Sequence, residues 1–443
     1  MEDHQPSPAL KNKRVTVMGL GRFGGGIAVA RFLVQQGASV LVTDKDSPEQ
    51  LAESIRQLSD LPIEYRLGQH LHADFTSADL VVTSPAVPPN NEFLVAAAAS
   101  GIPITTEICL FTQRCNKPFV AVTGTKGKST TTALLSRMLE TRHRLWTGGN
   151  IGKSLLADLP NINSAPNGYV LLEVSSYMLH YLAQTKWAPR VGVVTTVTAD
   201  HLDWHGGLEG YVAAKQHLIR FQSSHDHAIL NKEDPVSRDF APLTHAEVNW
   251  FDVASRPEVP LKIPGSHNQQ NAQAALAAAS VLGITHAEAC AAVAEFAGLP
   301  HRLELIHTSS TGVRYVNDSI ATIPQAAVAA LHAFPPGRVI QIVGGYDKHL
   351  DMTPLTTALA QRAKAVLTIG TIGPSLASAC RSDPHATASI IECGTLSTAM
   401  DSARSLAAPG DVILLSTGCA SYDQFPNFEK RGLAFAEIAR SHA

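Results

Sequence analysis

The stretch 119–139, "FVAVTGTKGKSTTTALLSRML", has residues that could hold phosphate groups. An apolar run leads into a Gly/Lys/Ser loop, and a segment with helical character follows. Loop amides and a helix N-terminus bind phosphate oxygens, Lys128 would reach the β- and γ-phosphates, and Ser129 would bind Mg²⁺. Val122 stands where the G-x-x-x-x-G-K-[ST] pattern has its first Gly, so a chance Gly-rich connection is the alternative. The loop predicts ATP as the ligand.

Acidic and imidazole groups follow two later apolar runs. Glu173 ends "YVLLE", and Asp200, His201 and Asp203 follow "VGVVTTVT". Polar groups at the carboxyl ends of parallel strands gather at one edge of a sheet, where phosphoryl-transfer sites place their metal ligands. A lone Glu or His is more often a hydrogen-bonded core or surface group. After a phosphate loop, however, Glu173 and His201 become candidates for metal ligands.

A second glycine-rich turn lies near the N-terminus, in "VTVMGLGRFGGG". Gly19, Gly21 and Gly24 fit G-x-G-x-x-G, and Asp44 follows 20 residues after Gly24. This spacing is typical of a dinucleotide-binding fold in which the acid contacts a ribose. Taken alone, it would indicate an NAD-dependent dehydrogenase.

Other candidates are individually weak. Asn268 and Asn271 are three residues apart and share one helix face, with a helix cap at Ser266 or Asn268 as the alternative. Arg302 could reach an interdomain cleft or be an exposed arginine, and Lys215 in "EGYVAAKQHLIR" has the pattern of a solvated lysine. Three loops that follow strand-like runs of the last segment contain further polar groups: Asp318, Lys348 and Ser421.

Composition limits the class of protein. The 443 residues exceed one ordinary core, so two or three domains are expected, and 45% apolar with 16% charged residues indicates a globular protein. A net charge of −3 predicts no nucleic-acid or membrane partner. The polar N-terminus has no signal-peptide pattern, no apolar run is long enough to span a membrane, and the six cysteines show no zinc spacing. We therefore expect a cytoplasmic protein with reduced cysteines.

Strand-like and Ala-rich helical runs alternate along the chain, which predicts an α/β protein with parallel sheets. The rhythm restarts near Pro103 and again near Leu303. We predict three domains: a Rossmann-like domain at 1–103, a central P-loop-type ATPase domain at 104–302, and a Rossmann-like domain at 303–443.

Taken together, these motifs resemble the Mur ligases, the ATP-dependent amide-forming enzymes of peptidoglycan precursor synthesis. The likeness runs in family order from "GLGRFG" and "TSPAVPP" through "GTKGKST", "GGNIG", "EVSSYML", "DHLDWH", "GSHNQQN", "GLPHR" and "NDSIAT" to "CASYDQFPNFEKRG". The last string is specific to the glutamate-adding branch. The first domain of this family binds the uridine nucleotide of the substrate, so the N-terminal glycines would face UDP and not NAD.

The resemblance implies roles for matching positions. The ATP-binding set is Gly124, Thr125, Lys126, Gly127, Lys128, Ser129, Thr130, Asn268, Asn271, Arg302 and Asp318. The residues for the UDP-substrate are Gly21, Arg22, Phe23, Asp44 and Asn150, and those for glutamate are Thr322, Lys348, Ser421 and Phe428. Lys128, Glu173, His201 and Lys215 would be catalytic. Two Mg²⁺ ions would be held by Ser129, Glu173, His201 and Lys215, the last as a carbamate.

The implied activity is the ATP-dependent addition of D-glutamate to UDP-N-acetylmuramoyl-L-alanine through an acyl phosphate, by a monomer acting on small molecules. Two departures touch the implied glutamate site: Ile320 replaces the Lys that follows "NDS" in the enterobacterial form, and Lys348 has altered neighbours. An enzyme that adds L-glutamate therefore stays an alternative. Another ligase of the superfamily, such as a folylpolyglutamate synthase, is a further alternative. An NAD-dependent dehydrogenase and a catalytically inactive nucleotide-binding regulator are alternatives from other classes.

Overall fold

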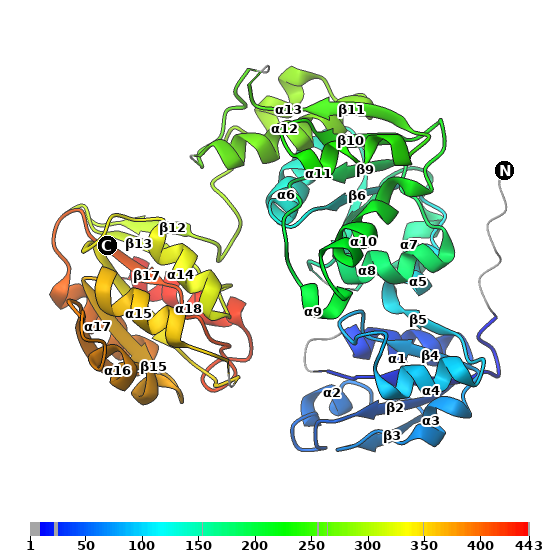
Figure 1. Cartoon of the computed structure of the whole chain (residues 1–443), viewed down its shortest axis with the longest axis horizontal. Coiled ribbons are helices and arrows are strands. Elements are labelled where there is room, and N and C mark those ends of the chain that lie inside the picture. The colour runs from blue at the N-terminus through cyan, green and yellow to red at the C-terminus, as the bar shows by residue number, and fades with distance from the viewer. Residues whose placement is uncertain are drawn as a thin grey trace. The chain divides into compact units, whose positions relative to one another are not determined.

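The computed structural model describes residues 9–21, 25–152, 154–254, 257–263, 265–348 and 350–441 (Figure 1). Within these residues, alternating strands and helices build three separate sheets. The chain forms two compact units: Met1–Phe296 contains the first two sheets, and Ala297–Ala443 contains the third. The predicted three-domain α/β class is confirmed.

The first sheet is parallel and has the order β3-β2-β1-β4-β5. Its strands are β1 (Arg14–Met18), β2 (Ser39–Asp44), β3 (Ile63–Leu67), β4 (Leu80–Thr83) and β5 (Ile104–Thr106), and its helices are α1 (Gly25–Gln35), α2 (Ala52–Arg56), α3 (His72–Thr76) and α4 (Glu92–Ala99). The chain runs from β1 outward through β2 and β3, then returns to β4 on the other side of β1. Ligands of such sheets bind where the order reverses, here at the carboxyl ends of β1 and β4.

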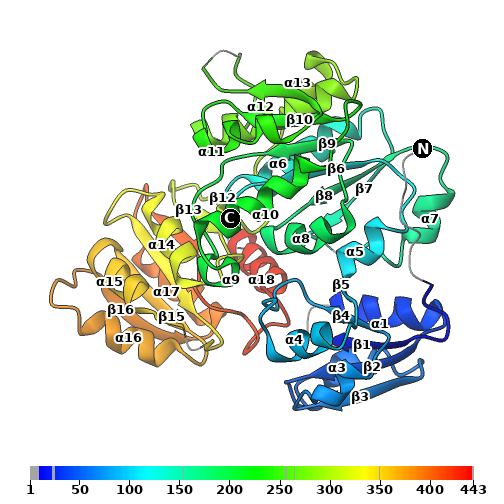
Figure 2. The same ribbon diagram turned by 45° about the vertical axis from the view of Figure 1, so that its right-hand side comes forward.

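The central sheet is also parallel, with the order β11-β10-β9-β6-β8-β7 (Figure 1 and Figure 2). Its strands are β6 (Phe119–Thr123), β7 (Leu145–Gly149), β8 (Tyr169–Glu173), β9 (Val191–Val194), β10 (His227–Asn231) and β11 (Glu247–Phe251). Its helices are α5 (Glu107–Thr112), α6 (Lys128–Leu139), α7 (Leu159–Ser164), α8 (Ser176–Leu182), α9 (Leu202–His205), α10 (Leu208–Arg220), α11 (Pro235–Arg238), α12 (Ser266–Val281) and α13 (His286–Val293), with short 3₁₀ turns η1 (Ala183–Thr185) and η2 (Ala241–Leu243). Helix α6 packs against α12 and α13, and α8 packs against α10. The phosphate loop thus follows an interior strand, β6.

The third sheet has the order β12-β13-β17-β14-β15-β16, and only the β12–β13 pair is antiparallel. Its strands are β12 (Glu304–Thr308), β13 (Arg314–Asn317), β14 (Val339–Gly344), β15 (Ala365–Ile369), β16 (Ser389–Gly394) and β17 (Val412–Leu415), and its helices are α14 (Pro324–His332), α15 (Thr353–Arg362), α16 (Gly373–Arg381), α17 (Leu396–Leu406) and α18 (Phe428–Arg440). The loops that follow β13, β14 and β17 open at one edge of the sheet. They contain the predicted glutamate-binding residues.

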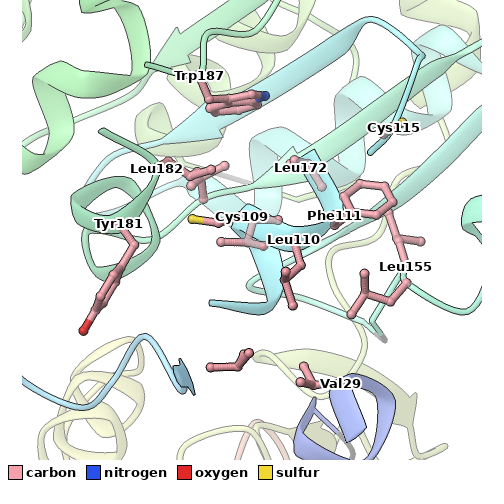
Figure 3. Close-up of a cluster of buried hydrophobic side chains, with 14 of the residues drawn as sticks. Val29, Cys109, Leu110, Phe111, Cys115, Leu155, Leu172, Tyr181, Leu182 and Trp187 are labelled. Atoms are coloured by element: carbon pink, nitrogen blue, oxygen red, sulfur yellow. The ribbon is translucent and has the colours of Figure 1, made fainter. Parts of the chain in front are cut away.

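Apolar side chains alternate between the two faces of the sheets. Val339 and Val343 of β14 belong to one cluster, while Ile340 and Ile342 belong to another on the opposite face. The first two sheets share a continuous cluster, in which Leu110 and Phe111 of α5 lie between Val29 of α1 and Trp187 (Figure 3). Full burial of such side chains contributes about 1.5–3 kcal/mol each. This cluster gives the first unit its common core.

The apolar pattern does not predict four of the strands: β5, β7, β11 and β16. Each lies at an edge of its sheet. Edge strands are paired on one side only, and the residues of β16, for example, are exposed or half-buried. Their apolar signal is therefore weaker than that of interior strands.

All six cysteines are free in the structure. Among the helices that the structure describes, none is long and apolar enough to cross a membrane.

Candidate active site

The phosphate loop connects β6 to α6 and is fixed against the loop that follows β9. Thr125 N donates to Thr196 O at 2.7 Å, and Thr125 Oγ1 donates to Thr198 O at 2.8 Å. Lys128 and Ser129 form the first turn of α6, whose amides have no partner within the helix. Lys128 Nζ donates to the carbonyls of Gly124 and Thr125 at 3.1 and 3.0 Å, so its ammonium lies over the loop.

Gly127 is required by its surroundings. Its φ is +87°, in the left-handed region, and a Cβ there would lie 2.2 Å from Oδ1 of Asn271. Asn271 is buried on α12, beside the phosphate loop, while Asn268 is half-buried one turn earlier. The cap of this helix is Gly265, without a side-chain hydrogen bond, so the alternative of a cap at Ser266 or Asn268 is wrong.

Glu173 lies at the end of β8, next to the phosphate-loop strand. Its side chain is 1% exposed, and Oε1 accepts a hydrogen bond from Asn150 Nδ2 at 2.7 Å. The other oxygen, Oε2, is buried without a hydrogen-bond partner. A buried carboxylate with an open oxygen costs free energy unless a cation is bound, so Glu173 fits the role of a Mg²⁺ ligand. Asn150, predicted with the UDP-substrate, lies here against Glu173.

Lys215 is buried in α10, which contradicts the interpretation of a solvated lysine. It is 1% exposed, Nζ donates to Gly124 O at 2.7 Å, and the ammonium lies 4.7 Å from the ring centroid of Tyr211. Burial, together with the charge of the neighbouring Lys128, lowers the pKa of Lys215 to about 7, against the opposing effects of Asp200 and Glu173. The local sequence therefore did not predict that the ammonium of Lys215 contacts the phosphate loop.

His201 precedes α9 and adopts a left-handed backbone, with φ of 50°. Its ring is exposed; Nε2 lies 3.4 Å from Asp200 Oδ2, and its centroid lies 4.8 Å from that of Tyr177. Among the residues the structure describes, no group of three His, Cys, Asp or Glu side chains could hold a metal alone. Magnesium commonly binds with one or two carboxylates, substrate phosphates and water.

Asp44 shapes the N-terminal glycine turn. Its Oδ2 accepts the amides of Leu20 and Gly21 at 2.8 and 3.1 Å, and Oδ1 accepts the amide of Asp46 at 2.9 Å. A Cβ at Gly26 would lie 2.2 Å from Leu20 O, so α1 starts tightly against the turn. The predicted contacts Arg22 and Phe23, with Gly24, lie outside the described residues.

In the second unit, the predicted nucleotide residues Arg302 and Asp318 lie together. Asp318 is buried and accepts hydrogen bonds from Ser416 Oγ at 2.6 Å and from Leu303 N at 3.1 Å. Burial raises the pKa of Asp318 to about 6, against the opposing hydrogen bonds and the charge of Arg302.

The predicted glutamate residues occupy the loops at one edge of the third sheet. Thr322 and Lys348 line a small cavity of about 10 Å³ that Gly418 and Cys419 also line, and a larger cavity of about 350 Å³ lies beside it. Ser421 Oγ is buried without a hydrogen-bond partner, whereas most buried polar groups have one. Phe428 begins α18 and does not line either cavity.

Sequence reasoning missed Arg431. It is 1% exposed, and its guanidinium donates to Ser319 Oγ and O at 2.9 and 2.8 Å and to Cys419 O at 3.1 Å. Burial lowers the pKa of Arg431 to about 10. It joins the loop that contains Thr322 to the loop that contains Ser421. A basic residue in a string such as "FEKRG" is usually solvated, so the local sequence does not predict the burial of Arg431.

Comparisons with known proteins agree with this geometry. Residues 13–106 match the MurD-like N-terminal domain of Mur ligases, residues 122–249 the Mur ligase middle domain, and residues 301–419 the Mur ligase glutamate ligase domain. The chain is 40% identical to the UDP-N-acetylmuramoylalanine–D-glutamate ligase of Roseiflexus sp. (strain RS-1), covering 98% of this chain and 99% of the relative. The chain belongs to the Mur ligase family.

Further relatives support this assignment. The enzyme of the same name from Acidobacterium capsulatum is 36% identical, covering 98% of this chain and 97% of the relative. Among solved structures, the UDP-N-acetylmuramate-alanine ligase of Thermotoga maritima has the same fold, with a TM-score of 0.58 and 21% identity over 98% of this chain and all of that one. Mur ligases form amide bonds at the expense of ATP in peptidoglycan precursor synthesis. The chain is therefore an enzyme of the ligase class, and the dehydrogenase interpretation of the N-terminal glycines is wrong.

Proposed function

We propose that this Mur ligase adds D-glutamate to UDP-N-acetylmuramoyl-L-alanine, with two Mg²⁺ ions, as a cytoplasmic monomer. The observation that carries the proposal is that Lys128 Nζ and Lys215 Nζ both donate to Gly124 O of the phosphate loop, with the charge of Glu173 near Lys215, in a chain whose full-length relatives are named for this reaction. We propose domains at 1–103, 104–302 and 303–443, which would bind the UDP-substrate, ATP and glutamate respectively.

In the proposed reaction, the L-alanyl carboxylate attacks the γ-phosphorus of ATP, and the bond to ADP breaks. The glutamate nitrogen then attacks the acyl carbon of the resulting acyl phosphate, the amide forms and phosphate leaves. Bound Mg²⁺ would neutralise charge between the two anions that meet in the first step. Lys128 and the loop amides would supply further positive charge, pre-oriented by α6.

The metal-holding residues would be Ser129, Glu173, His201 and a carbamylated Lys215. The unpartnered Oε2 of Glu173 supports the assignment of Glu173 as a Mg²⁺ ligand. A pKa of about 7 leaves much of the Lys215 amine neutral, which is the form that combines with CO₂. The carbamate would convert a buried cation into an anionic oxygen ligand beside the phosphate loop.

The remaining proposed contacts follow the matched positions. Gly124, Thr125, Lys126, Gly127 and Thr130 would hold ATP with Asn268, Asn271, Arg302 and Asp318. The UDP-substrate would meet Gly21, Arg22, Phe23, Asp44 and Asn150. Thr322, Lys348, Ser421 and Phe428 would hold glutamate, and the unpartnered hydroxyl of Ser421 supports this assignment.

Phosphate release from ATP tests the proposal. With UDP-N-acetylmuramoyl-L-alanine present, we expect D-glutamate to stimulate release and L-glutamate to give little. Release with L-glutamate but not with D-glutamate would overturn the stereochemical part of the proposal. This alternative is open because Ile320 removes a cation from the glutamate region. No release with either amino acid would contradict the proposed activity.

Gly127→Ala is expected to raise the KM for ATP about tenfold or more. A left-handed alanine costs roughly 1–2 kcal/mol, and the new Cβ would also displace Asn271 Oδ1. The matched control is Gly283→Ala, because Gly283 has a φ of +85° but a Cβ added there would meet no atom within 4 Å. Equal KM values for ATP in the two variants would show that the close contact with Asn271 is unimportant.

A further inference from the structure

The 84–88 loop of the first domain lies at the place where its sheet should bind a ligand. It follows β4, and β4 pairs with β1, whose own loop carries the glycine turn. The chain order reverses between these two strands, so their loops form the two walls of the binding crevice. The position of the 84–88 loop therefore decides the shape of one wall.

Two aromatic side chains of the central domain hold this loop by its backbone. Trp204 Nε1 donates to Ala86 O at 3.0 Å, and Tyr181 Oη donates to Val87 O at 3.3 Å. Backbone carbonyls are the acceptors in both bonds, so these bonds fix the backbone of the loop and do not involve its side chains.

The ring of Trp204 is itself supported from the side of the ATP site. Its centroid lies 4.8 Å from that of Tyr177, 5.1 Å from that of His180 and 4.5 Å from that of His205. His205 Nε2 in turn lies 2.9 Å from Ser176 Oγ. Helix α9, which contains Trp204, begins directly after His201. One ring thus touches both the first-domain loop and the helices that follow the predicted metal ligands.

We propose that Trp204 is a positioning residue for the nucleotide-substrate crevice. It sets the 84–88 loop relative to α9 through the bond to Ala86 O, and so aligns the crevice of the first domain with the face of the central domain that carries His201. This inference rests on the proposed function, because it takes UDP-N-acetylmuramoyl-L-alanine as the ligand of the crevice.

Trp204→Phe is the sharpest variant because it keeps an aromatic ring and removes the N–H donor. A net hydrogen bond contributes about 0.5–1.5 kcal/mol, so we expect the Kd for UDP-N-acetylmuramoyl-L-alanine to rise about 2- to 10-fold. Calorimetric titration without ATP measures this Kd on the full-length enzyme. The KM for ATP and the Tm should stay at their wild-type values. Tyr181→Phe should raise the same Kd by a smaller factor, since its bond is longer.

The matched control is Trp250→Phe, because Trp250 lies on β11 at the far edge of the central sheet. A wild-type Kd in Trp204→Phe would overturn the inference. Equal losses in substrate and ATP binding with a lower Tm would also overturn it, as they would show a merely structural role. If Trp204→Phe fails to fold, Tyr181→Phe decides the question alone. A wild-type enzyme that neither binds the substrate nor releases phosphate would instead defeat the proposed function itself.

Discussion

Replacing Lys215 by alanine or methionine is expected to lower kcat about 10²–10³-fold, the loss that follows removal of one preorganised electrostatic group from an active site. Lys215 is buried against Gly124 O and shares the phosphate-loop region with Lys128 and Glu173. Without it, no carbamate could supply an oxygen ligand there. Steady-state kinetics with saturating substrates measures the effect, and short carboxylates such as acetate or formate should partly restore the alanine variant by occupying the vacated space.

The control for this experiment is Lys232→Ala, which removes an exposed lysine of the same domain. Lys215→Met retains most of the buried volume, so its Tm distinguishes a chemical loss from a packing defect. Full activity of Lys215→Ala without added carboxylate would contradict the carbamate assignment.

The pH dependence of the modification follows from the same group. The neutral amine reacts with CO₂, and a pKa of about 7 makes that form increasingly available as the pH rises through 7. We therefore expect the ¹³C signal of the carbamate, formed with labelled bicarbonate, to weaken as the pH falls below 7. A signal of constant strength from pH 6 to pH 8 would contradict the lowered pKa.

The free energy of unfolding should also depend on pH through Lys215. The folded-state pKa of Lys215 lies below its ordinary value of 10.5, so the unfolded chain binds more protons between about pH 7 and 10.5. The cost of burying the ammonium is complete below that window and disappears as the pH rises through it. Lys215→Met should remove this contribution to the pH dependence of the free energy of unfolding.

The burial of Lys215 could have been read from its helix. Tyr211, Ala214, Leu218 and Ile219 are buried with it at the spacing i, i+3, i+4, i+7 and i+8. A lysine within such a stripe is either the end of the apolar face or a buried functional group. Composition alone favours a solvated residue, whereas the stripe together with the preceding phosphate loop favours burial.

Other parts of the site depend on contacts that no local pattern encodes. The phosphate loop was predictable, because its strand, loop and helix are adjacent in the chain. The hydrogen bond from Asn150 to Glu173 joins the loop that follows β7 to the last residue of β8, and it depends on the order β6-β8-β7. Arg431 likewise contacts Ser319 from 112 residues away. Parallel sheets make such pairs by strand order, which the alternation of apolar runs does not specify.

Glu173→Gln and His201→Ala are each expected to reduce turnover about 10²–10³-fold. Glutamine retains an oxygen that can accept the hydrogen bond from Asn150, so Glu173→Gln removes the charge while keeping the local shape. The lost activity should therefore come with a higher Mg²⁺ requirement, measured as the concentration giving half-maximal phosphate release. The exposed His225→Ala is the control for His201→Ala.

The two variants separate a metal site from a structural one. A carboxylate buried with Oε2 unpartnered destabilises the fold unless a cation is bound, so Glu173→Gln should leave the Tm equal or higher while activity falls. The same reasoning predicts that added Mg²⁺ raises the Tm of the wild type more than that of the variant. Wild-type rates in both variants would refute the metal assignment. A loss of Tm in Glu173→Gln that parallels the loss of activity would instead make Glu173 a packing residue. A buried charge that serves to bind a cation costs stability when the cation is absent, so its removal should not lower the Tm.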